Sequence, residues 1–302
     1  MGEVREGKRG SGEGGRTRPD ARRRAHAAGR STRRPYLRHL ASRTSRSPCS
    51  VTRAHLAELA SLHRRPAREA LGVFLVEGVR SVEAAVDAGA PLADVLVTED
   101  AARDPRVAAL LARVRADIHT VGARDIARVS DVETAQGVVA VARIPPAADL
   151  ARSRRVLALD GVQDPGNVGT LVRTAAWFGV DAVVAGPGTA DFFAPKVVRS
   201  AMGGLWDLGL ARVPDLAATL ADLRAAGFAV YGATLGGTDA ARWAPRAPSA
   251  LVLGSEAHGL APATLAALDE AITLAGSARR RGAESLNVAV AGGVLMQMWG
   301  EE

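Results

Sequence analysis

Asn167, Gly169 and Arg173 have the residue types and the helical spacing that could bind an anion. Gly169 and Arg173 are four residues apart, so on a helix they share one face. On that face the side chain missing at Gly169 leaves room, and the Arg173 guanidinium can reach an anionic group. The alternative interpretation is an ordinary strand–turn–helix with a solvated arginine, because an asparagine cap and one arginine are common.

The surrounding stretch is predicted to form a strand, a turn and a helix. An apolar run from Val156 to Leu159 is typical of a buried strand, and Pro165–Gly166 is typical of a turn. Asn167 is a good N-cap because its side-chain oxygen can accept a hydrogen bond from a free backbone N–H of the first turn. The helix is therefore expected from Val168 to Phe178, with Gly179 as the residue that ends it.

A glutamate follows the apolar run Ala250–Leu253, which is predicted to be another buried strand. Gly254 at the end of this strand lets a ligand approach the backbone closely, and Glu256 would lie just outside the carboxyl edge of the sheet, where open α/β sheets bind ligands. A plain loop with a solvated glutamate is the alternative. His258 is expected to be a surface residue, since nothing in the sequence pairs with it.

Three residues at the start of the last predicted helix, Ser285 to Asn287, could contribute to a binding site. Ser285 is the expected N-cap, and the helix runs to Trp299. Leu286 and Asn287 would lie in its first turn, where free N–H groups can hold an anionic or polar ligand. The alternative is a carboxyl-terminal helix that merely packs well.

The positive charge of the chain is concentrated at its start. Residues 1–50 hold 14 Lys or Arg and 4 Asp or Glu, whereas the rest holds 25 and 28, although the whole chain carries +7. The net charge therefore does not indicate that the folded part binds nucleic acid. Residues 1–50 are expected to be disordered because they contain few large apolar groups. A phosphate-binding arm, an over-extended start without a role and a transit peptide are the alternatives for this tail.

The composition limits the class of protein. A chain of 302 residues with 47% hydrophobic residues can form one or two domains with a sizeable core. No apolar run is long enough to cross a membrane. The single cysteine, Cys49, excludes an internal disulfide and any cysteine-built zinc site, which suits a reducing compartment.

Alternating strands and helices predict two α/β regions, residues 51–145 and 150–302, with a linker at Pro145–Pro146. In the first region helices are expected at Thr52–Arg65, Val79–Ala88 and Pro105–Arg115, and strands at Val73–Val76, Ala93–Val97, Ile118–Val121 and Gln136–Ala142. In the second region a helix is expected at Leu216–Ala226, and further strands at Ala182–Ala185, Leu208–Val213, Ala229–Ala233 and Ala271–Leu274. Continuous apolar strands between helices indicate a mainly parallel sheet covered on both faces.

In this order and spacing, the stretches resemble the signature motifs of the SpoU (TrmH-like) group of the SPOUT superfamily, which are RNA ribose 2′-O-methyltransferases. The motifs are Asn167 to Arg173, then Leu253–Glu256 with Gly259–Leu260, then Ser285–Val288. Phe74–Gly78 and Thr134–Val138 resemble the small α/β substrate-binding domain of this family, which is similar to a ribosomal-protein fold (L30e-like). The resemblance extends from Val51 to Trp299.

The resemblance implies a fold, a cofactor and two groups of site residues. The carboxyl-terminal α/β domain would thread a deep trefoil knot that binds S-adenosylmethionine. The protein would be a cytoplasmic homodimer that needs no metal and no membrane and methylates RNA, with rRNA favoured over tRNA. The catalytic group would consist of Asn167, Arg173, Glu256, Ser285 and Asn287. The cofactor-binding group, acting largely through backbone atoms, would consist of Thr234, Leu235, Gly254, Ile272, Leu274 and Leu286.

Several points depart from the family pattern or stay open. Ala257 and Thr273 stand where the family usually has glycine and proline, and Ser277–Gly282 lengthens the loop before the last helix. The three arginines of that loop could engage RNA phosphates, or the insertion could be a harmless bulge. Arg173 would reach toward the cofactor site of the partner subunit. There it would act either as the base for the ribose hydroxyl or, since a guanidinium rarely loses its proton, as a cation that holds the adjoining phosphate and stabilises the developing alkoxide.

Two other functions are alternatives to methyl transfer. A non-catalytic RNA-binding or ribosome-assembly protein on the same scaffold would not need to bind the cofactor. An oxidoreductase with a nucleotide cofactor is disfavoured, because the loop after Leu159 lacks the Gly-x-Gly-x-x-Gly arrangement.

Overall fold

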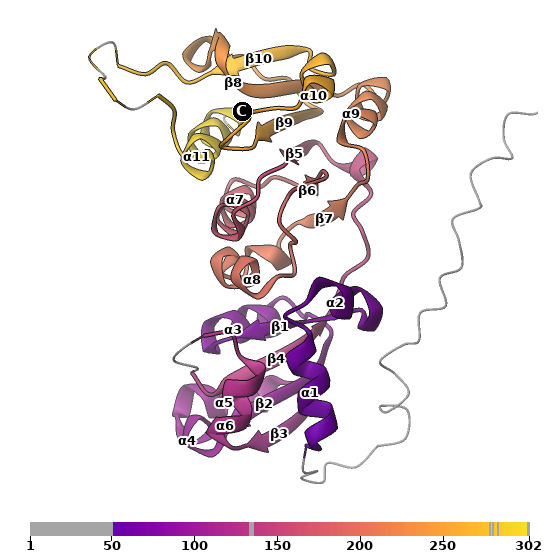
Figure 1. Ribbon diagram of the computed structural model, residues 1–302, viewed down its shortest axis with the longest axis vertical. Helices are drawn as coiled ribbons and strands as arrows, with labels where there is room; N and C mark the ends of the chain where they lie inside the picture. The colour runs from indigo at the N-terminus through magenta and orange to yellow at the C-terminus, as the bar shows by residue number, and fades with distance from the viewer. Residues whose placement is uncertain (1–50, 133–135, 278, 280, 283, 301–302) are drawn as a thin grey trace, which may run out of the picture. The chain divides into compact units, whose positions relative to one another are not determined.

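The computed structural model describes residues 51–132, 136–277, 279, 281–282 and 284–300 (Figure 1). The interpretations given for residues 1–50, for Thr134 and Ala135, and for Arg280 lie outside the described residues. Two separate β-sheets, of four and six strands, are present in the described part.

The first sheet has the strand order β1-β4-β2-β3. Strand β4 runs antiparallel to β1 and β2, and β3 runs parallel to β2. The strands are β1 (Val73–Glu77), β2 (Leu92–Thr98), β3 (Asp117–Val121) and β4 (Val138–Arg143). The helices of this half are α1 (Arg53–Ser61), α2 (Arg65–Leu71), α3 (Val79–Asp87), α4 (Glu99–Arg103), α5 (Pro105–Arg113) and α6 (Ala123–Val129).

Helices cover both faces of this sheet. Successive side chains of a strand point to opposite sides, so both faces carry apolar residues that need covering. Leu75 of β1 packs in one core with Leu59 of α1 and Ile126 of α6. Its neighbour Phe74 points into the other core, which includes side chains of α3 and α5 such as Val82. The predicted small α/β architecture therefore has two cores, one on each side of a single sheet.

Three short helices of this half were not predicted. Helices α2, α4 and α6 span 7, 5 and 7 residues, which is two turns or less. Segments of that length are too short to show a hydrophobic period. The helix predicted over Thr52–Arg65 is present as α1, but it ends earlier, at Ser61, and Arg65 begins the separate helix α2.

The second sheet has six parallel strands in the order β10-β8-β9-β5-β6-β7, which confirms the predicted parallel sheet. Its strands are β5 (Arg155–Asp160), β6 (Ala182–Ala185), β7 (Gly209–Arg212), β8 (Ala229–Asp239), β9 (Ser249–Gly254) and β10 (Glu270–Thr273). Its helices are α7 (Pro165–Trp177), α8 (Pro195–Ala201), α9 (Leu216–Ala225), α10 (Pro262–Ala266) and α11 (Val288–Trp299), with short 3₁₀ turns at Leu150–Arg152, Gly204–Trp206 and Ala240–Arg242.

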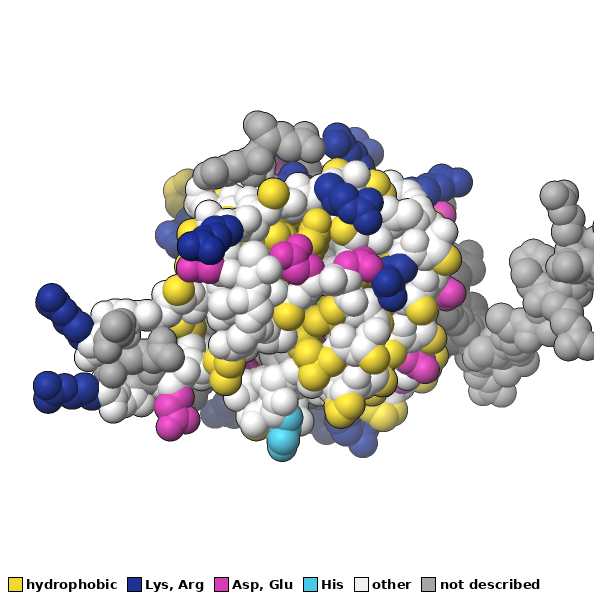
Figure 2. All heavy atoms as spheres, turned by 90° about the horizontal axis from the view of Figure 1, so that it is seen from above, with side chains coloured by type: hydrophobic (Ala, Val, Ile, Leu, Met, Phe, Trp, Pro, Cys, Tyr) yellow, Lys and Arg dark blue, Asp and Glu magenta, His cyan; other side chains and the backbone are white. Residues whose placement is uncertain are grey.

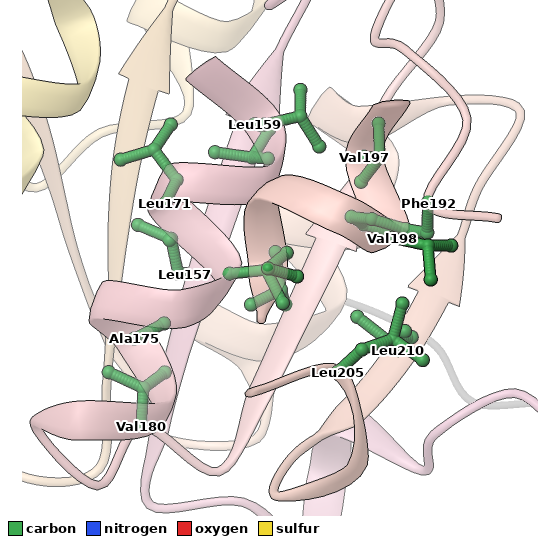
Figure 3. Packing of buried hydrophobic residues seen from close by; sticks show 14 of the residues in the cluster. Leu157, Leu159, Leu171, Ala175, Val180, Phe192, Val197, Val198, Leu205 and Leu210 are labelled. Atoms are coloured by element: carbon green, nitrogen blue, oxygen red, sulfur yellow. The ribbon is translucent and has the colours of Figure 1, made fainter. Parts of the chain in front are cut away.

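The two faces of this sheet also bury different residues. Leu157 and Leu159 of β5 pack with side chains of α7, such as Leu171, and of α8, such as Val197 (Figure 3). The alternate residues of β5, Val156 and Ala158, pack on the other face with side chains of α9, such as Leu220. Because both faces are buried, the strands read as continuous apolar runs, which is why they were predictable.

Strand β8 differs most from the prediction. It was expected over Ala229–Ala233 but extends to Asp239, because it pairs with β10 again after residues 233–237 leave the ladder. A Cβ at Gly237 would lie 2.3 Å from the carbonyl oxygen of Ala271, and Gly237 has φ of +140°. Only glycine suits both the close approach and this backbone conformation. Such an excursion leaves no period-2 signature in the sequence.

The chain crosses back after β10 to form α11, which packs against α7 and β9 (Figure 1). This return brings the carboxyl-terminal helix to the middle of the sheet, although β10 lies at the edge. The trefoil knot implied by the family resemblance stays a prediction.

Helices α7 and α8 approach each other closely at Gly169. A Cβ at this position would lie 2.5 Å from the Cβ of Ser200 and 2.6 Å from the carbonyl oxygen of Val197. The expectation that Gly169 leaves room for an anion is therefore wrong, since α8 fills that space. Gly169 is buried, whereas Arg173 one turn later is exposed.

We expect Gly169→Ala to destabilise the protein by about 1–3 kcal/mol, because the new methyl group must displace the α8 backbone. The helix propensity gained by alanine, about 1 kcal/mol, offsets only part of this cost. Urea unfolding followed by circular dichroism measures the change. Gly236→Ala is the matched control, because nothing lies within 4 Å of its Cβ position. An unfolding midpoint for Gly169→Ala at or above that of the wild type contradicts the packing argument.

Buried contacts join the two halves of the described chain, which belong to one compact unit. Arg68 of α2, only 2% exposed, donates from Nε to Oδ2 of Asp191 at 3.1 Å and from Nη1 to the carbonyl oxygen of Leu62 at 2.7 Å. The rings of Phe74 and Phe193 lie 4.8 Å apart. Removing one partner of such a buried ion pair leaves an uncompensated charge, so this contact is costly to break.

Candidate active site

Helix α7 begins at Pro165, with Asp164 as its N-cap. The Asp164 carboxylate accepts a hydrogen bond from the backbone N–H of Asn167 at 2.9 Å, and Pro165 occupies the first helical position, where no N–H is needed. The predictions of Asn167 as N-cap and of a turn at Pro165–Gly166 are therefore wrong. The hydrogen bond from Asn167, together with the neighbouring Lys196, lowers the pKa of Asp164 below its ordinary value.

Because Asp164 caps the helix, the side chain of Asn167 is available for other contacts. Its Nδ2 donates to Oε1 of Glu256, and its Oδ1 accepts a hydrogen bond from Nδ2 of Asn287 at 3.1 Å. Glu256 and Asn287 lie 89 and 120 positions after Asn167 in the sequence. The three residues come from the first turn of α7, the loop after β9 and the start of α11. Three of the predicted catalytic residues thus meet at one place.

The loop that carries Glu256 is a tight hairpin. Ser255 N–H donates to Gly259 O at 3.0 Å, and Gly259 N–H donates to Ser255 O at 2.8 Å. A Cβ at Gly254 would lie 2.3 Å from the carbonyl carbon of Gly259. The hairpin itself therefore occupies the space beside Gly254 where a ligand was expected to approach the backbone. A contact between the cofactor and the Gly254 backbone stays a prediction.

Helix α11 begins at Val288, and Asn287 is its N-cap. Oδ1 of Asn287 accepts hydrogen bonds from the backbone N–H groups of Ala289 at 2.9 Å and Val290 at 3.3 Å. The prediction of Ser285 as the cap is wrong, because Asn287 satisfies these N–H groups two residues later. Ser285 is exposed and precedes the helix.

The hydrogen bonds run in one direction from α11 to Glu256. The first N–H groups of α11 donate to Asn287, Asn287 donates to Asn167, and Asn167 donates to Glu256. Each amide therefore has one orientation that uses both its donor and its acceptor. Glu256 is exposed, and its second carboxylate oxygen accepts no hydrogen bond from the described residues. The arrangement presents an oriented carboxylate oxygen at the carboxyl edge of the sheet.

Arg173 does not contact this group. It lies six residues beyond Asn167, about 9 Å along the helix axis, on an exposed part of α7. Its guanidinium forms no hydrogen bond or ion pair with the described residues. Within one chain, the structure therefore brings together Asn167, Glu256 and Asn287, but neither Arg173 nor Ser285.

The predicted cofactor residues lie in or near the last three strands of the chain and the start of α11. Thr234 and Leu235 are in β8, Gly254 ends β9, Ile272 is in β10, Leu274 follows β10, and Leu286 precedes α11. Thr234 and Leu235 lie in the excursion of β8, where the Thr234 hydroxyl donates to the carbonyl oxygen of Gly236. The side chain of Ile272 is fully buried in the core, and that of Leu274 is partly buried. Ile272 can therefore contact a ligand only through its backbone, which is the kind of contact that was expected.

Two features of this edge suit the adenosine of S-adenosylmethionine. Leu235 and Leu286 are 82% and 54% exposed, so both present apolar surface to solvent. The backbone groups of Ala275 and Gly276 form no hydrogen bonds with other described residues, which leaves donors and acceptors for a polar ligand. Figure 2, which shows the end of the protein that bears β8 and β10, has apolar side chains open to solvent between charged ones.

Two residues outside the predicted catalytic and cofactor-binding groups support the site. Asp160, at the end of β5, accepts a hydrogen bond from the backbone N–H of Ala261 at 2.7 Å and so holds the segment after the hairpin. Lys196 of α8 donates to Asp164 at 3.3 Å. The signal for Asp164 was present in the sequence, because an Asp followed by Pro is typical of an N-cap and first helical position. Nothing in the sequence pointed to Asp160.

No group of three or more His, Cys, Asp or Glu side chains in the described part of the chain is arranged to hold a metal ion. No helix among the described residues is long and apolar enough to span a membrane.

The sequence matches two family models. Residues 154–297 match the SpoU rRNA Methylase family, and residues 54–140 match the MRM3-like substrate binding domain. A relative from Bacillus subtilis, the 23S rRNA (guanosine(2553)-2′-O)-methyltransferase RlmP, is 35% identical over 244 residues, which cover 78% of this chain and 91% of the relative. The chain belongs to the SpoU rRNA methylase family.

Other family members are similar to this chain in sequence or in structure over most of its length. The 23S rRNA (uridine(2479)-2′-O)-methyltransferase of Streptomyces viridochromogenes is 31% identical, with 89% of this chain and 94% of the relative covered. The crystal structure of the SpoU methyltransferase AviRb from the same organism, in complex with AdoMet, has a TM-score of 0.73 at 27% identity and covers 82% of this chain and 97% of that one. A Porphyromonas gingivalis structure described under the TrmH RNA methyltransferase family has a TM-score of 0.73 at 33% identity, with 83% and 98% covered.

Proposed function

We propose that this SpoU family member methylates a ribose 2′-hydroxyl of ribosomal RNA in the cytoplasm and uses S-adenosylmethionine as the methyl donor. The observation that carries the proposal is the hydrogen-bonded group of Asn167, Glu256 and Asn287 at the carboxyl edge of the parallel sheet. Relatives that are named 23S rRNA 2′-O-methyltransferases support rRNA as the substrate class.

The reaction forms a bond between the ribose oxygen and a methyl carbon, breaks the bond from that carbon to sulfur, and releases the hydroxyl proton. Bound S-adenosylmethionine supplies the methyl group on a positively charged sulfur. The protein must hold the hydroxyl in line with this group, and alignment alone can supply much of the rate. The free oxygen of Glu256, held in place through Asn167 and Asn287, is suited to accept a hydrogen bond from a ribose hydroxyl.

Leu235 and Leu286 would supply apolar surface for the adenine, and backbone groups of residues 274–276 would supply hydrogen-bond donors and acceptors for it. The large exposed fractions of the two leucine side chains support this arrangement. An apolar wall with a few backbone donors and acceptors is the common form of a nucleoside site.

We place Arg173 at the RNA phosphate or at the oxygen that gains negative charge during the reaction. Its guanidinium is exposed and has no partner among the described residues, so it is free to bind an anion. A guanidinium rarely gives up its proton near neutral pH, which favours charge stabilisation over a role as a base.

The protein is proposed to act as a homodimer through α7 and α11, the helix next to it. Helix α11 contains no charged residue, yet Val290 and Val294 are 53% and 42% exposed. Trp177 at the end of α7 is 84% exposed. A helix that is apolar on all sides is normally buried, and a second copy would cover this face. Arg173 lies on the same exposed side of α7 as Trp177, since the two are four residues apart, and would reach the site of the partner.

Changing both Val290 and Val294 to Glu should convert the dimer to a monomer, because two charges cannot be buried without partners. Sedimentation equilibrium measures the mass. Leu265→Glu on α10 is the control, because this leucine is 45% exposed on another helix and should leave the mass unchanged. A wild-type protein that sediments as a monomer at micromolar concentration contradicts the proposed dimer.

Methyl transfer can be tested directly with S-adenosylmethionine that carries a labelled methyl group. Purified protein is incubated with total rRNA and, separately, with total tRNA, both from cells that lack the gene. Label in rRNA at a ribose 2′-oxygen is the expected result. Label in tRNA alone would identify tRNA as the substrate. The absence of label in both pools would favour a non-catalytic RNA-binding protein on the same scaffold. Calorimetry with the cofactor separates these outcomes further, because a pure RNA binder need not bind it.

A further inference from the structure

A cavity of about 580 Å³ opens beside the end of β1 and the start of α3, away from the group formed by Asn167, Glu256 and Asn287. We call it the β1–α3 pocket. Its lining includes Glu77, Arg80, Ser81, Gln136 and Arg199. A cavity of this size can hold a nucleotide, since ligand sites commonly measure about 300–1,000 Å³.

The pocket contains a buried carboxylate with one unused oxygen. Glu77 is only 5% exposed. Its Oε2 accepts hydrogen bonds from the Ser130 hydroxyl at 2.9 Å and from Nη1 of Arg199 at 3.3 Å. Its Oε1 is buried and accepts no hydrogen bond from the described residues. An unsatisfied buried acceptor is unfavourable, and a ligand that donates an N–H would satisfy it.

Another side of the pocket carries positive charge. Helix α3 has no acidic residue in its first turn, and its N-cap, Gly78, provides no side chain. Gln136 accepts the N–H of Val79 at 3.1 Å, while the backbone N–H groups of Arg80 and Ser81 have no partner among the described residues. The Arg80 side chain likewise forms no ion pair there. Free N–H groups at a helix start together with a free guanidinium are suited to a phosphate.

We infer that the β1–α3 pocket binds one unpaired nucleotide of the RNA substrate, with the amino group of its base at Glu77 and a phosphate at Arg80 and the start of α3. This inference rests on the proposed function, because it names how the amino-terminal half recognises the RNA. A carboxylate accepts hydrogen bonds but cannot donate them. Adenine, cytosine and guanine offer an exocyclic amino group with two N–H donors. The single imino N–H of uracil lies between two carbonyl oxygens, which the Glu77 carboxylate repels, so the pocket selects against uracil.

Labelled hexamers of adenylate, cytidylate and uridylate test this inference by fluorescence anisotropy with the full-length protein. The wild type should bind the adenylate or the cytidylate hexamer about tenfold more tightly than the uridylate hexamer. Glu77→Gln should lose this preference, because the amide presents a donor as well as an acceptor. Equal binding of the three hexamers by the wild type would overturn the inference.

Arg80→Ala should weaken the binding of all three hexamers to a similar extent and lower the slope of log K against log salt by about one. This exposed residue can be changed without disturbing the core, so the test stands even if Glu77→Gln fails to fold. Arg115→Ala, at an exposed position two residues after the end of α5, is the matched control and should bind like the wild type. Binding by Arg80→Ala equal to that of the Arg115→Ala control would also overturn the inference.

The labelled methyl assay on rRNA separates this inference from the proposed function. Methyl transfer without a base preference in the hexamers would overturn the pocket and leave the function standing. A base preference that depends on Glu77, without methyl transfer, would support the pocket and contradict the catalytic proposal.

Discussion

Asn167→Asp should lower the rate of methyl transfer by at least about 100-fold at neutral pH, while the protein stays folded. The substitution keeps the size of the side chain but replaces the Nδ2 donor that binds Glu256 with a second carboxylate oxygen. Two carboxylates at hydrogen-bond distance repel each other, so Glu256 moves away or one of the pair takes up a proton. Single-turnover methylation of rRNA measures the rate.

The pH dependence of this variant provides a sharper test. A shared proton raises the pKa of one carboxyl group of such a pair, so part of the lost rate should return as the pH falls toward 5. Gln163→Glu is the matched control, because it makes the same change from amide to carboxylate four residues earlier, at an exposed position. Wild-type rates for Asn167→Asp across this range would show that the contact between Asn167 and Glu256 has no part in the reaction.

Arg173→Ala and Arg173→Lys should each lower the rate of methyl transfer, by about 100- to 1,000-fold for the alanine variant. Lysine keeps the charge but loses the forked donor, so it should restore little of the rate. Cofactor affinity and the mass in solution should stay close to those of the wild type, because Arg173 is exposed and has no partner among the described residues. Stopped assays on rRNA measure the rate, and calorimetry measures cofactor binding.

Arg242→Lys is the control for this pair, because Arg242 is an exposed arginine in a 3₁₀ turn outside the proposed site. It should methylate rRNA like the wild type. If Arg173→Ala also did so as a dimer, Arg173 would have neither of the proposed roles, whether that of a base or that of an aligning cation.

The strands of the six-stranded sheet were the most predictable part of the fold. Strand β6 has the predicted bounds, Ala182–Ala185, and β5 and β9 differ from the prediction by a residue at each end. Burial on both faces makes such strands continuously apolar, and that pattern depends only on local sequence. The second part of β8 and the short helices α2, α4 and α6 were missed because no such pattern marks them.

The helix starts show where local sequence is ambiguous. Both Asp164 and Asn167 are good N-caps, and both Ser285 and Asn287 are as well. In each case the sequence contained the residue that caps the helix, but local preference did not decide between the two candidates. At α7 the Pro165 that follows Asp164 favours the earlier start, and Lys196 supports the Asp164 carboxylate from α8.

The sequence by itself determined which residue types the site contains and that they follow the ends of regular elements, because motifs and hydrophobic periods are local. Only the tertiary structure decided which of these residues touch. Asn167 reaches Glu256 and Asn287 because the parallel order of β5 and β9 brings α7 and the hairpin after β9 to one edge, and because the chain returns from β10 to α11 beside them. It also decided that α8 fills the space beside Gly169 and that a hairpin fills the space beside Gly254, since close approaches between distant segments leave no trace in local spacing.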